Sequence, residues 1–258
     1  MQISGIQKLT LVDFPDRVAA TVFTRGCNFR CPFCHNPELV IPQQYSPLLE
    51  EKQIFDFLEK RYGKLTGLCI TGGEPLLQKD IETFIPHMKA LGFDIKLDTN
   101  GSFPDKLERL IKAGDLDYIA MDIKSSLSKY SVVTNSNSTT GVISSEVERS
   151  SKKISPPPTG MSGSRNDKLI ENIKKSIKLI MDSGIDYEFR TTVCHPLHEI
   201  QDFQEIGKMI KGAKRYFLQN FVASKQISEH QKFTPFTDDE LKTAQKIMAD
   251  YAKEVRIR

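Results

Sequence analysis

The stretch Cys27-Asn-Phe-Arg-Cys31-Pro-Phe-Cys34 places three cysteines within eight residues near the N-terminus of the chain. No histidine or fourth cysteine follows at a spacing that would complete a zinc knuckle. A structural zinc site needs four protein ligands, whereas an iron-sulfur cubane held by three thiolates leaves one iron open. The triplet therefore predicts an iron-sulfur cluster with one iron free to bind a reactant.

Other roles for the cysteines remain as alternatives. A zinc ion with His35 as fourth ligand is one, although adjacent residues rarely direct both side chains at one ion. A disulfide framework is disfavoured, because the chain has five cysteines and starts without a basic-then-apolar signal segment. A reducing, cytoplasmic compartment follows. We expect Cys69 and Cys194, which lie in apolar stretches, to be buried core residues and not ligands.

The pattern Cys-x3-Cys-x2-Cys, with an aromatic residue before the last cysteine, resembles the signature of the radical S-adenosylmethionine (SAM) superfamily. More narrowly, Leu9-Thr-Leu-Val-Asp-Phe-Pro15 and Cys34-His-Asn-Pro-Glu-Leu-Val40 resemble the activating proteins of anaerobic ribonucleoside-triphosphate reductases. This resemblance implies that Cys27, Cys31 and Cys34 hold a 4Fe-4S cluster whose open iron binds SAM. It also implies reduction by flavodoxin or ferredoxin, and a glycyl-radical enzyme as partner.

Composition indicates a soluble enzyme of one domain. The chain has 258 residues, of which 39% are hydrophobic and 27% charged, within the range of a single α/β barrel domain. No segment approaches the roughly 18 consecutive apolar residues that a membrane span requires. A net charge of +3 is too small to indicate a nucleic-acid partner. We therefore expect neither a membrane nor a nucleic acid as partner.

Short β-branched or apolar stretches alternate with longer amphipathic ones, which is typical of repeated strand-helix units and a parallel sheet. The expected strands are Arg17–Thr24, Gly67–Thr71, Asp94–Asp98, Tyr118–Asp122, Tyr187–Thr192 and Arg215–Asn220. The first expected helix runs from Ser46 or Pro47 to Tyr62, and the others are Lys79–Leu91, Pro104–Ala113, Asp167–Ser183, Asp202–Ile210 and Asp238–Glu254. Six units predict an α/β fold, a partial (β/α)6 TIM-like barrel that is open along one side, as the radical SAM resemblance also implies.

One interval is too long for a single unit. Asp122 and Arg190 are 68 positions apart, whereas one strand-helix unit takes roughly 30 residues. Ten of the 34 residues from Ser131 to Ser164 are serine, and this composition cannot bury enough apolar surface to offset its ordering. We expect residues 131–165 to be a disordered insertion after the fourth strand of a single domain spanning 1–258. A loop that folds on a partner is the alternative.

The chemical motifs all fall at the expected carboxyl ends of strands, the edge that carries active sites in β/α barrels. Gly72 and Gly73 would let the backbone approach a ligand closely, and Glu74 could accept from an ammonium. Together they resemble the superfamily's GGEP segment, which holds the SAM amino group. Alone, a Gly-Gly pair is an ordinary turn.

Two carboxylates, Asp98 and Asp122, are expected on neighbouring strand ends, where they would repel each other unless a cation lay between them. Similar positions in the activating enzyme of pyruvate formate-lyase form a monovalent cation site. That resemblance carries over to Asp98, Thr99, Met121 and Asp122. The alternative is that Asp98 only caps the following turn.

Three further residues are assigned to SAM by resemblance, namely Lys124, Arg190 and Asn220. For Arg190 a surface salt bridge is the alternative. The function implied is a radical SAM activase that takes a hydrogen atom from a glycine Cα of anaerobic ribonucleotide reductase. The chemistry then belongs to the cluster and SAM, and no side chain is needed as acid or base. A radical SAM enzyme acting on a small molecule or nucleotide, such as a deazapurine synthase, is the first alternative, and a non-catalytic iron-sulfur or zinc protein is the second.

Overall fold

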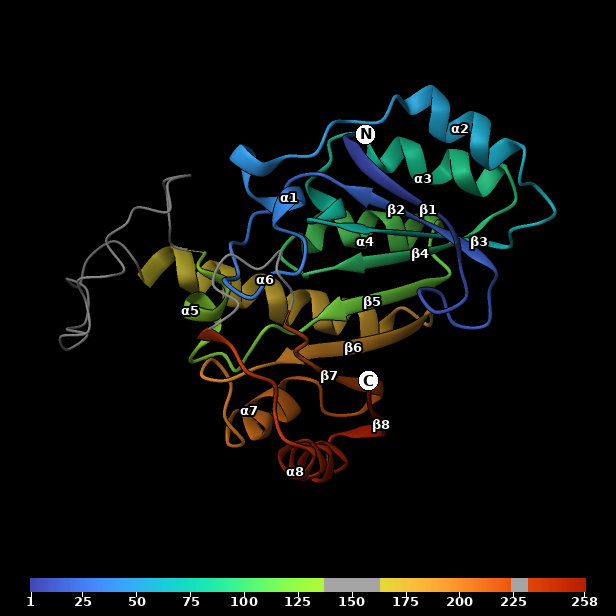
Figure 1. Cartoon of the computed structure of the whole chain (residues 1–258). Coiled ribbons are helices and arrows are strands. Elements are labelled where there is room, and N and C mark those ends of the chain that lie inside the picture. The colour runs from blue at the N-terminus through green and yellow to red at the C-terminus, as the bar shows by residue number, and fades with distance from the viewer. Residues whose placement is uncertain (137–162, 224–231) are drawn as a thin grey trace.

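The computed structural model describes residues 1–136, 163–223 and 232–258, which form one eight-stranded sheet with its strands in chain order. The first strand runs antiparallel to the second and all later neighbours are parallel. The strands are β1 (Ile3–Thr10), β2 (Ala19–Thr24), β3 (Gly67–Gly72), β4 (Asp94–Thr99), β5 (Tyr118–Asp122), β6 (Asp186–Val193), β7 (Ala213–Asn220) and β8 (Ala252–Ile257). Within the described ranges β1 and β8 are not paired with each other, so the sheet does not close (Figure 1).

Helices connect the parallel strands. They are α1 (Pro37–Val40), α2 (Glu51–Glu59), α3 (Ile81–Ala90), α4 (Pro104–Ala113), α5 (Tyr130–Thr134), α6 (Gly163–Asp182), α7 (Asp202–Met209) and α8 (Asp238–Met248), with 3-10 turns at Pro42–Gln44 and Pro75–Leu77. None of the helices in the described part of the chain is both long and apolar enough to cross a bilayer.

The core lies between the sheet and the helices. Ile70 on β3, Leu97 on β4 and Ile119 on β5 are completely buried, and α4 contributes Leu107 and Leu110 from its apolar face. Gly114 ends α4 in the left-handed region with φ 73°, where a residue without Cβ is the least strained. This packing holds the parallel strands in register and sets their carboxyl ends side by side.

The open α/β fold is confirmed, and the six expected strands correspond to β2–β7. Two strands were missed, because β1 and β8 are edge strands that are only partly covered and carry no continuous apolar stretch. The expected helix Asp238–Glu254 is wrong in its last turns, since α8 ends at Met248 and Ala252 begins β8. The barrel is therefore open although it has eight strands and not six.

The long interval after β5 differs from expectation at both of its ends. Ser131 lies within the short helix α5, and α6 begins at Gly163. The expected insertion of 131–165 is therefore too long at each side. The expectation of disorder for its centre, 137–162, lies outside the described residues.

Candidate active site

The loop between β2 and α1 carries the three cysteines of the motif, and all three thiols are free. Asn100, which follows β4, donates its side-chain amide to Asn28 Oδ1 at 3.0 Å and places it 3.8 Å from Cys27 Sγ. The thiols of Cys27, Cys31 and Cys34 line one cavity of about 200 Å³ at the carboxyl ends of β3–β6. The structure thus brings the three predicted ligands together.

The chemistry of these thiols is compatible with an iron-sulfur cluster. Burial raises the pKa of Cys27 and of Cys31 to about 12, so each keeps its proton unless a metal replaces it. In the described parts of the chain no three His, Cys, Asp or Glu side chains converge as the ligands of one ion would. In a cubane cluster each thiolate binds a different iron, which requires wider spacing. The backbone N–H of Phe29 also donates to Cys27 Sγ at 3.4 Å, as donors near cluster sulfurs commonly do.

The Gly72-Gly73 turn packs directly on the cysteine loop. The amide of Gly73 donates to Thr24 O at 2.9 Å, and a Cβ added to Gly73 would lie 2.0 Å from Gly26 O. Gly72 has φ 120°, a conformation that side chains rarely adopt. Both glycines line the cavity of the thiols. The turn therefore requires glycines because its backbone lies close to the backbone of the cysteine loop.

Glu74, in contrast, lies behind the turn and is not part of the cavity wall. Its carboxylate accepts from Thr99 Oγ1 at 2.8 Å, from the amide of Asn100 at 2.7 Å and from the amide of Leu76 at 3.0 Å. Burial raises the pKa of Glu74 to about 7, against the effect of these donors. Glu74 thus ties the end of β3 to the end of β4, and its predicted contact with an ammonium has no support in this geometry.

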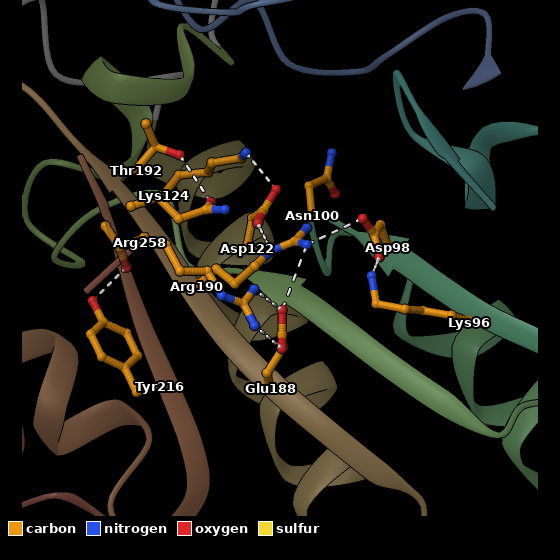
Figure 2. A network of polar contacts seen from close by, with 12 residues as sticks. Lys96, Asp98, Asn100, Asp122, Lys124, Glu188, Arg190, Thr192, Tyr216 and Arg258 are labelled. Carbon is orange, nitrogen blue, oxygen red and sulfur yellow. Dashed lines mark hydrogen bonds and ion pairs between the residues drawn. The ribbon is translucent and has the colours of Figure 1, made fainter. Parts of the chain in front are cut away.

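Arg190 on β6 bridges the two predicted carboxylates (Figure 2). Its Nε donates to Asp122 Oδ1 at 2.8 Å and its Nη1 to Asp98 Oδ2 at 3.2 Å. Each carboxylate also has a lysine of its own, Lys124 at 2.9 Å from Asp122 and Lys96 paired with Asp98. Burial opposes ionisation here, but the Arg190 charge and that of the lysine partner lower the pKa of both aspartates.

These contacts bear on the predicted monovalent cation. Met121 packs its side chain into the apolar core, and Thr99 directs its hydroxyl to Glu74. The position between Asp98 and Asp122 is held by the guanidinium of Arg190. Arg190 therefore offsets the repulsion between the two carboxylates, and a monovalent cation at these residues stays a prediction.

The remaining predicted contact lies elsewhere. Asn220 uses its side-chain amide to bind the backbone of Phe236, donating to its oxygen and accepting from its nitrogen at 2.9 Å each. It does not line the cavity of the thiols. Lys124, Asp98, Thr99 and Asp122 do line it.

A second cavity of about 480 Å³ meets the first at Asp98, which lines both. Its wall contains further charged residues that the sequence analysis missed, namely Asp13, Lys96, Glu188 and Arg258. A signal was present for two of them. Lys96 precedes Asp98 by two positions on β4, and Glu188 precedes Arg190 by two on β6, so each pair lies on one face of its strand.

Comparison with known proteins identifies the same chemistry. The family model described as the radical SAM superfamily matches residues 21–211. A protein of Methanocaldococcus jannaschii named as a glycyl-radical enzyme activating enzyme is 30% identical over 258 residues, covering 99% of this chain and 95% of the relative. The pyruvate formate-lyase-activating enzyme of Listeria monocytogenes is 31% identical over 140 residues, covering 48% of this chain and 53% of that enzyme.

Solved structures share the fold at low identity. TYW1 with a lysine-pyruvate adduct superposes with a TM-score of 0.57 at 12% identity, covering 91% of this chain and 74% of that chain. SuiB of Streptococcus suis bound to S-adenosylmethionine gives 0.57 at 15% identity, covering 90% of this chain and 48% of that chain. At such identities these likenesses concern the fold alone.

Proposed function

The chain belongs to the radical SAM superfamily and to its glycyl-radical enzyme activating group, and we propose that its partner is anaerobic ribonucleotide reductase. In this proposal the enzyme removes a hydrogen atom from a glycine Cα of that partner. The observation that carries it is the set of three free thiols in one cavity, with a Gly-Gly turn packed on their loop. The segment Leu9–Pro15 supports the choice of partner through its resemblance to the reductase activating proteins.

Different residues of the site have different proposed roles in binding the cluster and SAM. Cys27, Cys31 and Cys34 would hold the cluster, and Gly72 and Gly73 would offer backbone groups to the amino acid end of SAM. When bound and reduced by one electron, the cluster and SAM together supply a 5′-deoxyadenosyl radical. The protein itself binds, orients and excludes water.

Two cations are suited to the carboxylate of SAM. Lys124 lines the cavity, and Arg190, which lines the neighbouring larger cavity, binds Asp98 and Asp122 where these line the cavity of the thiols. Both are kept charged by those aspartates, since burial alone would lower the pKa of each and the ion pairs raise it. They would attract and orient a carboxylate, and neither needs to transfer a proton.

Two further proposals concern the electron donor and the cellular location of the protein. We propose flavodoxin or ferredoxin as the electron donor and the cytoplasm as the location, consistent with five free cysteines. Cys69 and Cys194 are both buried core residues, so neither is placed as a surface ligand of an additional cluster.

A small-molecule substrate is the second candidate, and the larger cavity favours it. Lys96, Glu188, Arg190 and Arg258 converge there, as polar groups do in small-molecule sites. These groups are paired with one another or with Asp98, so a ligand in the larger cavity would have to replace existing ion pairs.

The test is electron paramagnetic resonance of the reduced, reconstituted protein mixed anaerobically with SAM and anaerobic ribonucleotide reductase. We expect the doublet of a glycyl radical, its absence with Cys31→Ala, and its persistence with Cys194→Ala as the matched control. If no doublet forms while a nucleotide or metabolite stimulates release of 5′-deoxyadenosine, the small-molecule function replaces this one.

A further inference from the structure

The charged network of Figure 2 continues from Asp98 and Asp122, which line the cavity of the thiols, to Glu188 and Arg258. Glu188 is 1% exposed, and Arg258 donates a hydrogen bond to each of its carboxylate oxygens, from Nη1 to Oε1 at 3.0 Å and from Nη2 to Oε2 at 3.2 Å. Tyr118 donates its hydroxyl to Oε2 at 2.9 Å. Neither Glu188 nor Arg258 lines the cavity of the thiols.

Arg190 is close enough to Glu188 to be drawn to it. Its Nη1 lies 3.8 Å from Glu188 Oε1 and 3.2 Å from Asp98 Oδ2. Without Arg258, Oε1 would keep Arg190 as its nearest cation, because Tyr118 serves the other oxygen. A buried carboxylate that loses a paired cation is strongly unfavourable, so it would recruit Arg190.

Asp98 and Asp122 could release Arg190 at moderate cost in free energy, since each carboxylate is also paired with a lysine. Asp98 would retain Lys96, and Asp122 would retain Lys124 at 2.9 Å. The position of Arg190 therefore depends on which carboxylate lacks another partner. In the structure that partner is supplied to Glu188 by Arg258, which also stacks on Phe217 at 3.5 Å.

We propose that Arg258 is a positioning residue for SAM binding, because by pairing with Glu188 it leaves Arg190 bound to Asp98 and Asp122, the two aspartates that line the cavity of the thiols. This inference rests on the SAM-binding role proposed above. It predicts that a residue outside the SAM cavity controls affinity for SAM, and that the effect disappears when the competing carboxylate is removed.

The experiment is calorimetric titration of SAM into the reconstituted, unreduced protein, so that binding is measured without turnover. Arg258→Gln is expected to weaken binding by about tenfold or more, the equivalent of one charge-assisted hydrogen bond. Arg258→Gln combined with Glu188→Gln is expected to restore the dissociation constant to near that of the wild type. Arg256→Gln is the matched control, since Arg256 lies on β8 two positions before Arg258, is 68% exposed and pairs with Glu254.

Thermal unfolding of each variant separates folding from binding. If Arg258→Gln does not fold, Arg258→Lys is used in its place. A lysine cannot donate to both carboxylate oxygens of Glu188 as the guanidinium does, so SAM binding should weaken. Adding Glu188→Gln to this variant should again restore SAM binding. Unchanged affinity in the folded Arg258 variant overturns the proposal, and so does a double variant that binds as weakly as the single one. Failure of the wild type to bind SAM would instead refute the proposed function.

Discussion

Replacing Gly73 by alanine tests whether the glycine turn supports the cysteine loop. The added Cβ would lie 2.0 Å from Gly26 O and 3.3 Å from the backbone nitrogen of Cys27. Both neighbours are backbone atoms, so no side-chain rotation can relieve the contact. The Gly26–Cys27 segment has to move away, and its hydrogen bond from the amide of Glu74, 2.8 Å long, is stretched or lost.

The expected magnitude follows from these two effects. Overpacking of this kind costs about 1–3 kcal/mol, and loss of one hydrogen bond adds about 1 kcal/mol. A fall in the free energy of unfolding of about 2–4 kcal/mol corresponds to a fall in Tm of roughly 4–16 °C for a domain of this size. Because the strain falls on the first ligand of the cluster, iron content should fall as well.

The assay combines iron and sulfide analysis after anaerobic reconstitution with a thermal melt of the same sample. Gly5→Ala is the control, since its Cβ would meet the Phe23 ring at an ordinary 3.5 Å. Full iron loading and an unchanged Tm in Gly73→Ala would refute the inferred contact between the glycine turn and the cysteine loop.

Three other predictions concern separate parts of the chain. Burial raises the pKa of Glu74 from 4.5 to about 7, so the folded protein binds a proton at Glu74 more tightly than the unfolded chain does. The protonated side chain therefore adds on the order of 3 kcal/mol to the free energy of unfolding below pH 4.5, and this contribution is lost as the pH rises to 7. Chemical denaturation across this range should show that loss in the wild type and not in Glu74→Gln, and equal pH slopes would contradict the burial argument. Because Arg190 holds Asp98 and Asp122 together, replacing sodium and potassium by choline at constant ionic strength should leave SAM cleavage unchanged; activity lost in choline and regained with potassium would instead show the monovalent cation. Deleting residues 137–162, whose composition offers little apolar surface, should leave cluster loading and SAM binding intact, and a loss of either would show that the segment is needed.

The central strands could be predicted from sequence because each is a short, continuous apolar stretch bounded by turn residues. Ala252–Ile257 could not, since an edge strand shows charged residues to solvent and its pattern continued that of the preceding helix. Ile3–Thr10 was missed for the same reason, having three exposed residues in succession. Amphipathic periodicity loses its discriminating power where only one side of a strand is covered.

The candidate site could likewise be predicted from the sequence only in part. That the cysteines, the glycine turn and the two aspartates would meet could be predicted, because parallel strands bring their carboxyl ends to one edge. Which groups pair there could not, since pairing depends on side-chain direction and on distances of a few ångströms between separate strands. Glu74 accepts from the amide of Asn100 behind its own loop, and Asn220 binds the backbone of Phe236. Arg190 binds the two aspartates for which a monovalent cation is predicted.

The most direct test of hydrogen abstraction from glycine uses a partner reductase whose glycines carry deuterium at Cα. The reduced protein is mixed anaerobically with this partner and unlabelled SAM, and the 5′-deoxyadenosine formed is analysed by mass spectrometry. The account predicts one deuterium in the 5′-deoxyadenosine together with a glycyl radical on the partner. 5′-Deoxyadenosine that contains only protium, formed at the same rate with or without the partner, would contradict it.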